Sequence, residues 1–190
     1  MMQELSMHVV DIVANSIKAE ATEIAVTIIE SEVDDKRGFK VVDNGIGIKA
    51  DMLDKVLDPF YTTRTTRRFG LGLPLLKMTC TMCDGEFIAS SIPWEKTEIE
   101  AYCKRSHLDT PGWGQMAAMW MECFSAFRGG RLLFTFEFDS KDVVMDSEEI
   151  KQALGDEELC YEPSVLIQLR DMLANQLREY IREETYEIIK

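Results

Sequence analysis

The sequence lacks long hydrophobic runs, a signal-peptide pattern and an excess of positive charge. No apolar segment approaches the roughly 20 residues that a membrane-spanning helix needs. The first residues, 1–5, have neither the basic nor the apolar region of a signal peptide. We therefore expect a cytoplasmic protein. The formal net charge of −13 argues against binding to nucleic acid or to an anionic membrane surface, because both need a basic face on the protein.

The number of cysteines is odd, since the chain has five. We interpret these residues as free thiols in a reducing compartment. Cys80 and Cys83 form a C-x-x-C pair inside a predicted helix, without a clear second pair of ligands. Packing thiols are therefore favoured over a metal or redox role, which remains the alternative.

Two familiar nucleotide-binding signatures are also missing. The P-loop pattern G-x-x-x-x-G-K-[ST] does not occur anywhere in the chain. The run G-L-G-L-P-L at 70–75 lacks the third glycine of a dinucleotide fingerprint, and it follows a predicted loop rather than a strand. A nucleotide site in this protein would need a different arrangement.

Hydrophobic periodicity predicts a layered arrangement in the first half of the chain. Apolar residues recur at helical spacing first, and short β-branched runs follow them. The predicted helices are 4–19, 49–57 and 70–82, and the predicted strands are 23–30, 39–42, 86–92 and 97–103. This order favours a two-layer α/β sandwich with helices on one face of the sheet.

The 190 residues are enough for one ordinary domain and a smaller appendage. A boundary is predicted at 106–114, which gives a first domain at 1–105 and a small α/β unit at 106–190. The elements predicted in this unit are helices at 115–127, at 147–154 and from about 164, and strands at 131–138 and 142–145. Because the core of a unit of about 80 residues is only marginally stable alone, we expect this unit to pack against the first domain or against a partner.

The last predicted helix carries an apolar stripe. Its members are Leu166, Leu169, Leu173, Leu177 and Tyr180. Such a stripe is more often part of the protein's own core than a docking surface for a partner. Six further large side chains are expected to pack the junction between the two parts, with a Met-rich docking surface as the alternative. They are Trp94, Trp113, Trp120, Met116, Met119 and Met121.

The run D-I-V-A-N-S-I-K at 11–18 supplies polar groups on one face of the first helix. Asp11 and Asn15 are four residues apart, so they share a face. The amide oxygen of Asn15 suits Mg²⁺. Asp11 could orient or deprotonate an attacking water, and Lys18 can reach the same phosphates. An ordinary solvated helix face is the alternative.

The run D-N-G-I-G-I at 43–48 ends a predicted strand. Its glycines permit a tight turn and let the backbone approach a ligand closely. We predict that Asp43 accepts a hydrogen bond from the exocyclic amine of adenine, with Gly45 and Gly47 beside the nucleotide. Guanine lacks this donor, so the run predicts adenine selectivity. A simple tight turn is the alternative.

The third run, G-L-G-L-P-L at 70–75, begins a predicted helix with the glycines Gly70 and Gly72. Backbone N–H groups at a helix N-terminus favour anions. The preceding segment 62–68 has three arginines and four threonines, and we predict a lid that closes over phosphates. A solvated basic loop is the alternative. The predicted phosphate contacts are Thr63, Arg64, Arg67, Gly70, Leu71 and Gly72.

Together these runs resemble the motifs of the GHKL superfamily, the gyrase, heat-shock chaperone, histidine-kinase and mismatch-repair ATPases that share the Bergerat fold. The run 11–18 is similar to the N box of that superfamily, 43–47 to its first glycine box, and Gly70 with Gly72 to its second. The segment 58–60 looks like the kinase F box.

The resemblance covers about 1–103 and also includes Thr97, which matches a threonine that helps to hold adenine in the family. It implies an α+β fold, a Bergerat-type two-layer α/β sandwich with a mixed sheet and helices on one face, followed here by the small C-terminal unit. It also implies that ATP and Mg²⁺ bind between the first helix and the lid.

Within the superfamily, short stand-alone bacterial proteins described as histidine-kinase-like ATP-binding proteins look closest, especially over 58–77. The segment 14–24 is close to the mismatch-repair version. Hydrolysing members have a glutamate as general base where this chain has Asp11, and the shorter side chain argues against fast ATP hydrolysis. Neither His8 nor His107 sits in a helical hairpin of the phospho-acceptor type, so we do not expect a self-phosphorylating sensor kinase. A packing or capping role is favoured for His8.

We therefore expect a Mg²⁺- and ATP-binding, histidine-kinase-like regulator that phosphorylates or switches a separate protein partner. One alternative is an ATP-driven clamp or weak ATPase of the mismatch-repair or chaperone kind, which would form a homodimer with ATP. Another is a non-catalytic interaction module. Binding to nucleic acid or to a membrane is not expected.

Overall fold

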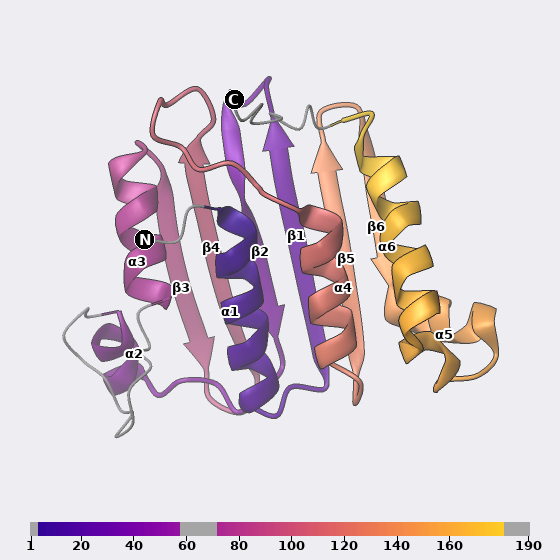
Figure 1. Cartoon of the computed structure of the whole chain (residues 1–190). Coiled ribbons are helices and arrows are strands. Elements are labelled where there is room, and N and C mark those ends of the chain that lie inside the picture. The colour runs from indigo at the N-terminus through magenta and orange to yellow at the C-terminus, as the bar shows by residue number, and fades with distance from the viewer. Residues whose placement is uncertain (1–3, 58–71, 181–190) are drawn as a thin grey trace, which may run out of the picture.

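A computed structural model describes residues 4–57 and 72–180 of the chain. In these ranges six strands form one sheet in the order β3-β4-β2-β1-β5-β6 (Figure 1). The strands are β1 (Glu23–Ser31), β2 (Lys36–Asp43), β3 (Glu86–Ile92), β4 (Lys96–Lys104), β5 (Arg131–Phe138) and β6 (Lys141–Asp146). β1 pairs parallel with β5, and the other neighbours are antiparallel. The predicted mixed sheet and the α+β class are thus confirmed.

The helices cover one face of this sheet. They are α1 (Leu5–Lys18), α2 (Ala50–Val56), α3 (Gly72–Met82), α4 (Met116–Ala126), α5 (Ser147–Leu154) and α6 (Pro163–Leu177), with a short 3₁₀ turn η1 (Leu159–Tyr161). Figure 1 shows α1, α3 and α4 in front of the same face, with α6 beside β6. α1 buries Leu5, Val9 and Ile12, which recur at helical spacing and therefore face the sheet together. None of these helices is long and apolar enough to cross a membrane.

The strands alternate between the two faces of the sheet. In β1 the side chains of Ile24, Val26 and Ile28 are fully buried beneath the helices, as a period of two requires. The opposite face carries charges, where Lys40 pairs with Glu98 and with Glu100, the latter at 2.9 Å. The helix-covered face therefore holds the core.

The C-terminal part of the chain extends the same sheet. β5 pairs with β1 from Glu23 opposite Arg131 to Glu30 opposite Phe138, so the strands of both parts are continuous. The division at 105/106 stays a prediction, although the two parts share this sheet. The stripe of α6 packs inward: Leu173 and Leu177 are buried, and Leu166, Leu169 and Tyr180 pack against the core. The prediction that this stripe is intramolecular is confirmed.

Two of the three tryptophans are core residues. Trp113 and Trp120 are buried, as predicted, and so are Met116 and Met119, whereas Met121 is partly buried against the core. The prediction for Trp94 is wrong, because its side chain is 81% exposed. It occupies the turn between β3 and β4 with φ of +65°, and this backbone conformation leaves the ring outside the sheet.

Candidate functional site

The carboxylate of Asp43 lies buried at the end of β2. Its Oδ2 accepts a hydrogen bond from Ser16 Oγ at 2.7 Å, and its Oδ1 accepts one from the Gly45 N–H at 2.9 Å. Both donors are uncharged. A carboxylate offers about four acceptor positions, and the residues that the structure describes fill two of those of Asp43.

The turn after Asp43 is seated on the end of α1. The Ile46 N–H donates to the Ala19 carbonyl at 2.8 Å. A Cβ placed on Gly45 would lie 2.5 Å from the same carbonyl oxygen, and Gly47 has a φ of +70°. Glycine is therefore required at both positions, at the first by close approach and at the second by backbone conformation.

Asn44 anchors this turn on its other side. Its Oδ1 accepts hydrogen bonds from the Thr22 N–H at 2.8 Å and the Glu23 N–H at 2.9 Å, and its Nδ2 donates to Thr22 Oγ1 at 2.9 Å. No role was predicted for Asn44 from the motifs. It satisfies backbone groups at the start of β1, and so it holds the carboxylate of the preceding residue in place.

Thr97 lies next to Asp43 across the sheet. The two residues are register partners in β2 and β4, and Thr97 is in turn the partner of Ser91 in β3. Thr97 Oγ1 lies 3.0 Å from Ser91 Oγ, which also accepts the Ile48 N–H at 2.8 Å. Three adjacent strand ends therefore present polar side chains at one level of the sheet.

Ser16 and Ser91 contact two of the predicted site residues, although no motif indicated either serine. Ser16 follows Ile12 by four residues, and it is a buried polar residue on the core-facing side of α1, which was a usable signal. The role of Ser91 depends on strand register and has no local signal. Both serines fix groups that we predicted to hold adenine.

The exposed face of α1 carries the other predicted residues. Asp11, Asn15 and Lys18 are all exposed along it. α3 begins close by, since a Cβ on Gly72 would lie 3.0 Å from Asp11 Oδ2. The structure thus brings the first and third sequence runs together at Asp11 and Gly72.

Several predicted contacts fall outside the residues that the structure describes. They are Thr63, Arg64, Arg67, Gly70 and Leu71, together with the F-box segment 58–60. Their roles remain predictions.

His8 is buried in α1, one turn before Asp11. It is only 2% exposed, and its Nδ1 has no hydrogen-bond partner within the described ranges. Burial lowers the pKa of His8. The negative charge of Asp11 acts in the opposite direction but does not outweigh burial. A buried neutral imidazole fits the packing role favoured for this residue.

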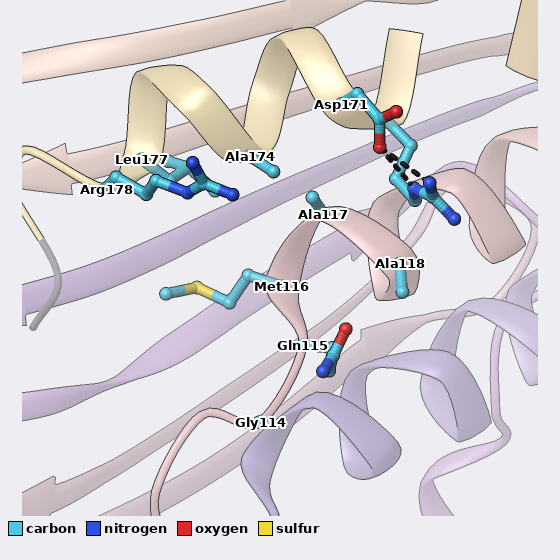
Figure 2. A pocket seen from close by; sticks show the side chains of 10 residues that line it. Gly114, Gln115, Met116, Ala117, Ala118, Asp171, Ala174, Leu177 and Arg178 are labelled. Carbon is cyan, nitrogen blue, oxygen red and sulfur yellow. Dashed lines mark hydrogen bonds and ion pairs between the residues drawn. The ribbon is translucent and has the colours of Figure 1, made fainter. Parts of the chain in front are cut away.

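Two hollows lie beside α4. One of about 320 Å³, between α1 and α4, has Asp11 in its wall. The other, of about 400 Å³, lies between α4 and α6, where Ala117 and Ala174 face each other (Figure 2). None of the predicted site residues lines the second hollow. Residues 4–57 and 72–180 contain no group of three acidic, histidine or cysteine side chains placed to hold a metal ion.

Comparison with known proteins identifies the family of the chain. A family model for histidine kinase-, DNA gyrase B- and HSP90-like ATPases matches residues 3–107. The chain belongs to this ATPase family. The matched range contains every strand from β1 to β4 and ends before α4. β5 and β6 therefore widen the sheet beyond the range matched by the ATPase family model.

Two solved structures are similar to the chain. The N-terminal domain of a DNA repair protein has 13% identity and a TM-score of 0.47, over 75% of this chain and 52% of that one. The ATPase domain of Aquifex aeolicus MutL complexed with ADP has 14% identity and a TM-score of 0.45, over 82% of this chain and 70% of that one. The chain thus spans about half the length of the DNA repair domain. No curated protein matches the sequence.

Proposed function

We propose that this ATPase-family chain binds Mg²⁺ and ATP and acts as a histidine-kinase-like regulator that phosphorylates or switches a separate protein. The observation that carries the proposal is the carboxylate of Asp43. It is buried, held by two uncharged donors and still able to accept further hydrogen bonds. The exocyclic amine of adenine is a suitable donor for that free capacity.

The remaining residues take complementary roles in this proposal. Gly45 and Gly47 let the backbone approach the base, and Thr97 supports it from β4. Asn15 would hold Mg²⁺ through its amide oxygen, because this metal takes a few protein oxygens together with phosphate oxygens and water. Bound Mg²⁺ would neutralise charge on the phosphates. Lys18, exposed on α1, would contact the same phosphates.

The remaining phosphate contacts and the acid–base residue complete the assignment. The proposed phosphate contacts are Thr63, Arg64, Arg67, Gly70, Leu71 and Gly72. Asp11 would orient the attacking group, and the start of α3 at Gly72 lies against it. Backbone N–H groups at that helix end favour the negative charge of the phosphates.

A separate partner is proposed because neither histidine lies in a helical hairpin of the phospho-acceptor type. His8 is 2% exposed and so cannot meet a γ-phosphate without local unfolding. Nδ1 of His107 accepts the Asp109 N–H at 3.1 Å, which ties the ring into the turn after β4. Asp11 replaces the glutamate of hydrolysing relatives, which favours a regulator over a fast ATPase.

The first experiment measures ATP binding by calorimetry with and without Mg²⁺. Asn15→Ala should abolish Mg²⁺-dependent binding, because it removes the proposed metal ligand. Asn175→Ala is the matched control, since it removes an exposed asparagine from α6. Tight Mg²⁺-dependent binding by Asn15→Ala would refute the site, and a wild-type chain that binds no ATP would favour a non-catalytic interaction module.

The second experiment follows the label of γ-phosphate-labelled ATP in wild type and in Asp11→Ala. The regulator should keep ATP bound and intact, and should pass the label to a partner added from cell extract. Release of free phosphate that depends on Asp11, together with ATP-dependent dimerisation in light scattering, would instead establish the clamp. Asp142→Ala serves as control because Asp142 is exposed on β6.

A further inference from the structure

The hollow of about 320 Å³ between α1 and α4 has walls that are fixed to each other. The two helices pack side by side on the sheet (Figure 1). The Leu5 N–H donates to the Gly112 carbonyl at 3.0 Å, and the Ser6 N–H donates to the Trp113 carbonyl at 3.2 Å. These bonds tie the first turn of α1 to the segment that leads into α4. The α1–α4 hollow, as we call it, is bounded mainly by Met7, Val10, Asp11, Ala118, Met119 and Glu122.

One part of the lining of the α1–α4 hollow is apolar. Met7 of α1 is 47% exposed, and Met119 of α4 is only 3% exposed. Val10 is partly buried against the core, and the small side chain of Ala118 occupies little of the space between the helices. Methionine is unbranched and adapts its shape to different contacts. This part of the lining therefore suits an apolar side chain of a ligand.

The other part of the lining is acidic. Glu4, Asp11 and Glu122 are exposed carboxylates of the hollow, and no lysine, arginine or histidine lines it among the described residues. Within 4–57 and 72–180, none of the three forms an ion pair. No three acidic side chains of these ranges are placed to hold a metal ion. Separated negative charges around an apolar centre therefore favour a ligand with several separated positive charges.

We propose that the α1–α4 hollow docks a segment of the separate partner protein, in which an apolar side chain is flanked by lysine or arginine. The apolar side chain contacts Met7 and Met119, and its burial supplies affinity. The flanking cations pair with Glu4 and Glu122, and these complementary charges select the partner and speed its association. A second copy of this chain is disfavoured as the occupant, because two chains of net charge −13 repel each other.

The position of the α1–α4 hollow gives this docking a consequence for the candidate site. Asp11 belongs to the wall of the hollow, and the start of α3 at Gly72 lies against the same carboxylate. A docked segment thus lies next to the residue proposed to orient the attacking group. This link to phosphoryl transfer rests on the proposed function, whereas docking itself needs no nucleotide. The wall formed by α4 lies outside the range that the ATPase family model matches.

The test follows the methionine methyl signals of the full chain by NMR during titration with two capped synthetic peptides. One peptide has a leucine between two pairs of arginines, and the other has glutamates in place of the arginines. We expect the arginine peptide to shift the signals of Met7 and Met119 until they saturate, and the glutamate peptide to leave them unchanged. The signal of Met145, buried in β6, should stay in place. Added salt should weaken the binding, because it screens exposed charges.

Two variants with matched controls test the two parts of the lining. Glu122→Gln should raise the Kd of the arginine peptide roughly two- to fivefold, as expected for one exposed ion pair. Glu149→Gln, on the exposed side of α5, is its control and should leave the Kd unchanged. Met7→Gln should also raise the Kd, because it replaces an apolar contact by a polar one. Met172→Gln is its control, since Met172 is 45% exposed on α6.

Three results would overturn the docking proposal. They are equal binding of both peptides, an equal Kd in Glu122→Gln and Glu149→Gln, and a Met7 signal that moves with chain concentration alone, which would assign the hollow to a second copy.

Calorimetry with ATP separates this proposal from the proposed function. Met7→Gln and Glu122→Gln should bind ATP as the wild-type chain does, because neither residue belongs to the proposed nucleotide site. A wild-type chain that docks the arginine peptide but binds no ATP would refute the proposed function and support the docking site. A chain that binds ATP but not the peptide would refute the docking site alone.

Discussion

Two buried carboxylates stand at opposite ends of the β1–β2 hairpin, on the face that the helices cover. Glu30 accepts four hydrogen bonds: Arg37 donates at 2.8 and 2.9 Å, Arg105 at 2.7 Å and the Trp113 indole at 2.8 Å. Asp43 accepts two, both from uncharged donors. Within the described residues, the acceptor capacity of Glu30 is used, whereas part of that of Asp43 is not.

The difference separates a structural carboxylate from one available to a ligand. Burial raises the pKa of Glu30, but the hydrogen bonds and charge of Arg37 and the bond from Arg105 outweigh it, so the pKa lies below its usual value. Glu30 thereby fixes the segment that leads from β4 to α4. Asp43 has comparable burial, and among residues 4–57 and 72–180 only two donors bind its carboxylate.

The largest expected effect is the loss of stability in Glu30→Ala. The substitution leaves two arginines without their shared partner, and removing one member of a buried ion pair costs about 3 kcal/mol or more. Urea unfolding measures this loss. Glu32→Ala is the control, because Glu32 pairs with Arg105 from a position that is 74% exposed and should cost less than about 1 kcal/mol. Equal losses of stability in the two variants would contradict the structural role of Glu30.

Asp43→Asn should weaken ATP binding with little change in stability. Hydrogen bonds to a charged group contribute about 1.5–3 kcal/mol, which corresponds to roughly a 10- to 100-fold higher Kd. Calorimetry measures the affinity, and thermal unfolding checks the fold. The exposed Asp142→Asn is the control. Unchanged affinity for ATP would show that the free acceptor positions of Asp43 serve no nucleotide.

Trp113→Phe tests a single bond to Glu30. The variant keeps an aromatic ring in the core but loses the indole N–H donor, and we expect a loss of about 1.5 kcal/mol in the free energy of unfolding. Trp94→Phe is the control, because Trp94 is 81% exposed and makes no comparable bond within the described ranges. If Trp113→Phe loses no more free energy of unfolding than Trp94→Phe, the bond from Trp113 to Glu30 does not stabilise the fold.

The smallest expected effect is a loss of stability in acid. The pKa of Glu30 is lowered from 4.5, and that of Glu98 falls to about 2. Folded-state pKa values below the unfolded ones stabilise the fold above the unfolded pKa, and this contribution is lost as pH falls through the folded value. Stability should therefore decline from about pH 4.5 downward. Urea unfolding at several pH values measures the slope, which should be shallower in Glu30→Gln than in the wild-type chain.

Local elements were predictable where the sequence carries a local period. α1 and β1 match the predicted 4–19 and 23–30 to within a residue or so. β2 begins at Lys36, three residues before the predicted start at 39, because its charged first residues pair with the end of β1. Pairing with β1 thus extends β2 at its start, over residues whose side-chain pattern did not indicate a strand.

The distant relations were not predictable from local pattern. The junction of β1 with β5 joins residues about a hundred positions apart, and no local feature of either strand specifies it. At the candidate site, Asp43 and Asn15 were indicated by motif. The supports Ser16 and Ser91 act through packing and register, which exist only in the folded sheet.

The parallel pairing of β1 with β5 has a consequence for synthesis on the ribosome. β1 is an interior strand, yet its second neighbour is made about a hundred residues later. At 5–20 residues per second, the nascent strand has an unpaired edge for roughly 5 to 20 s. Such an edge is a template for unwanted pairing. Translation that pauses before Arg131 would therefore prolong the interval in which the newborn chain needs protection by chaperones.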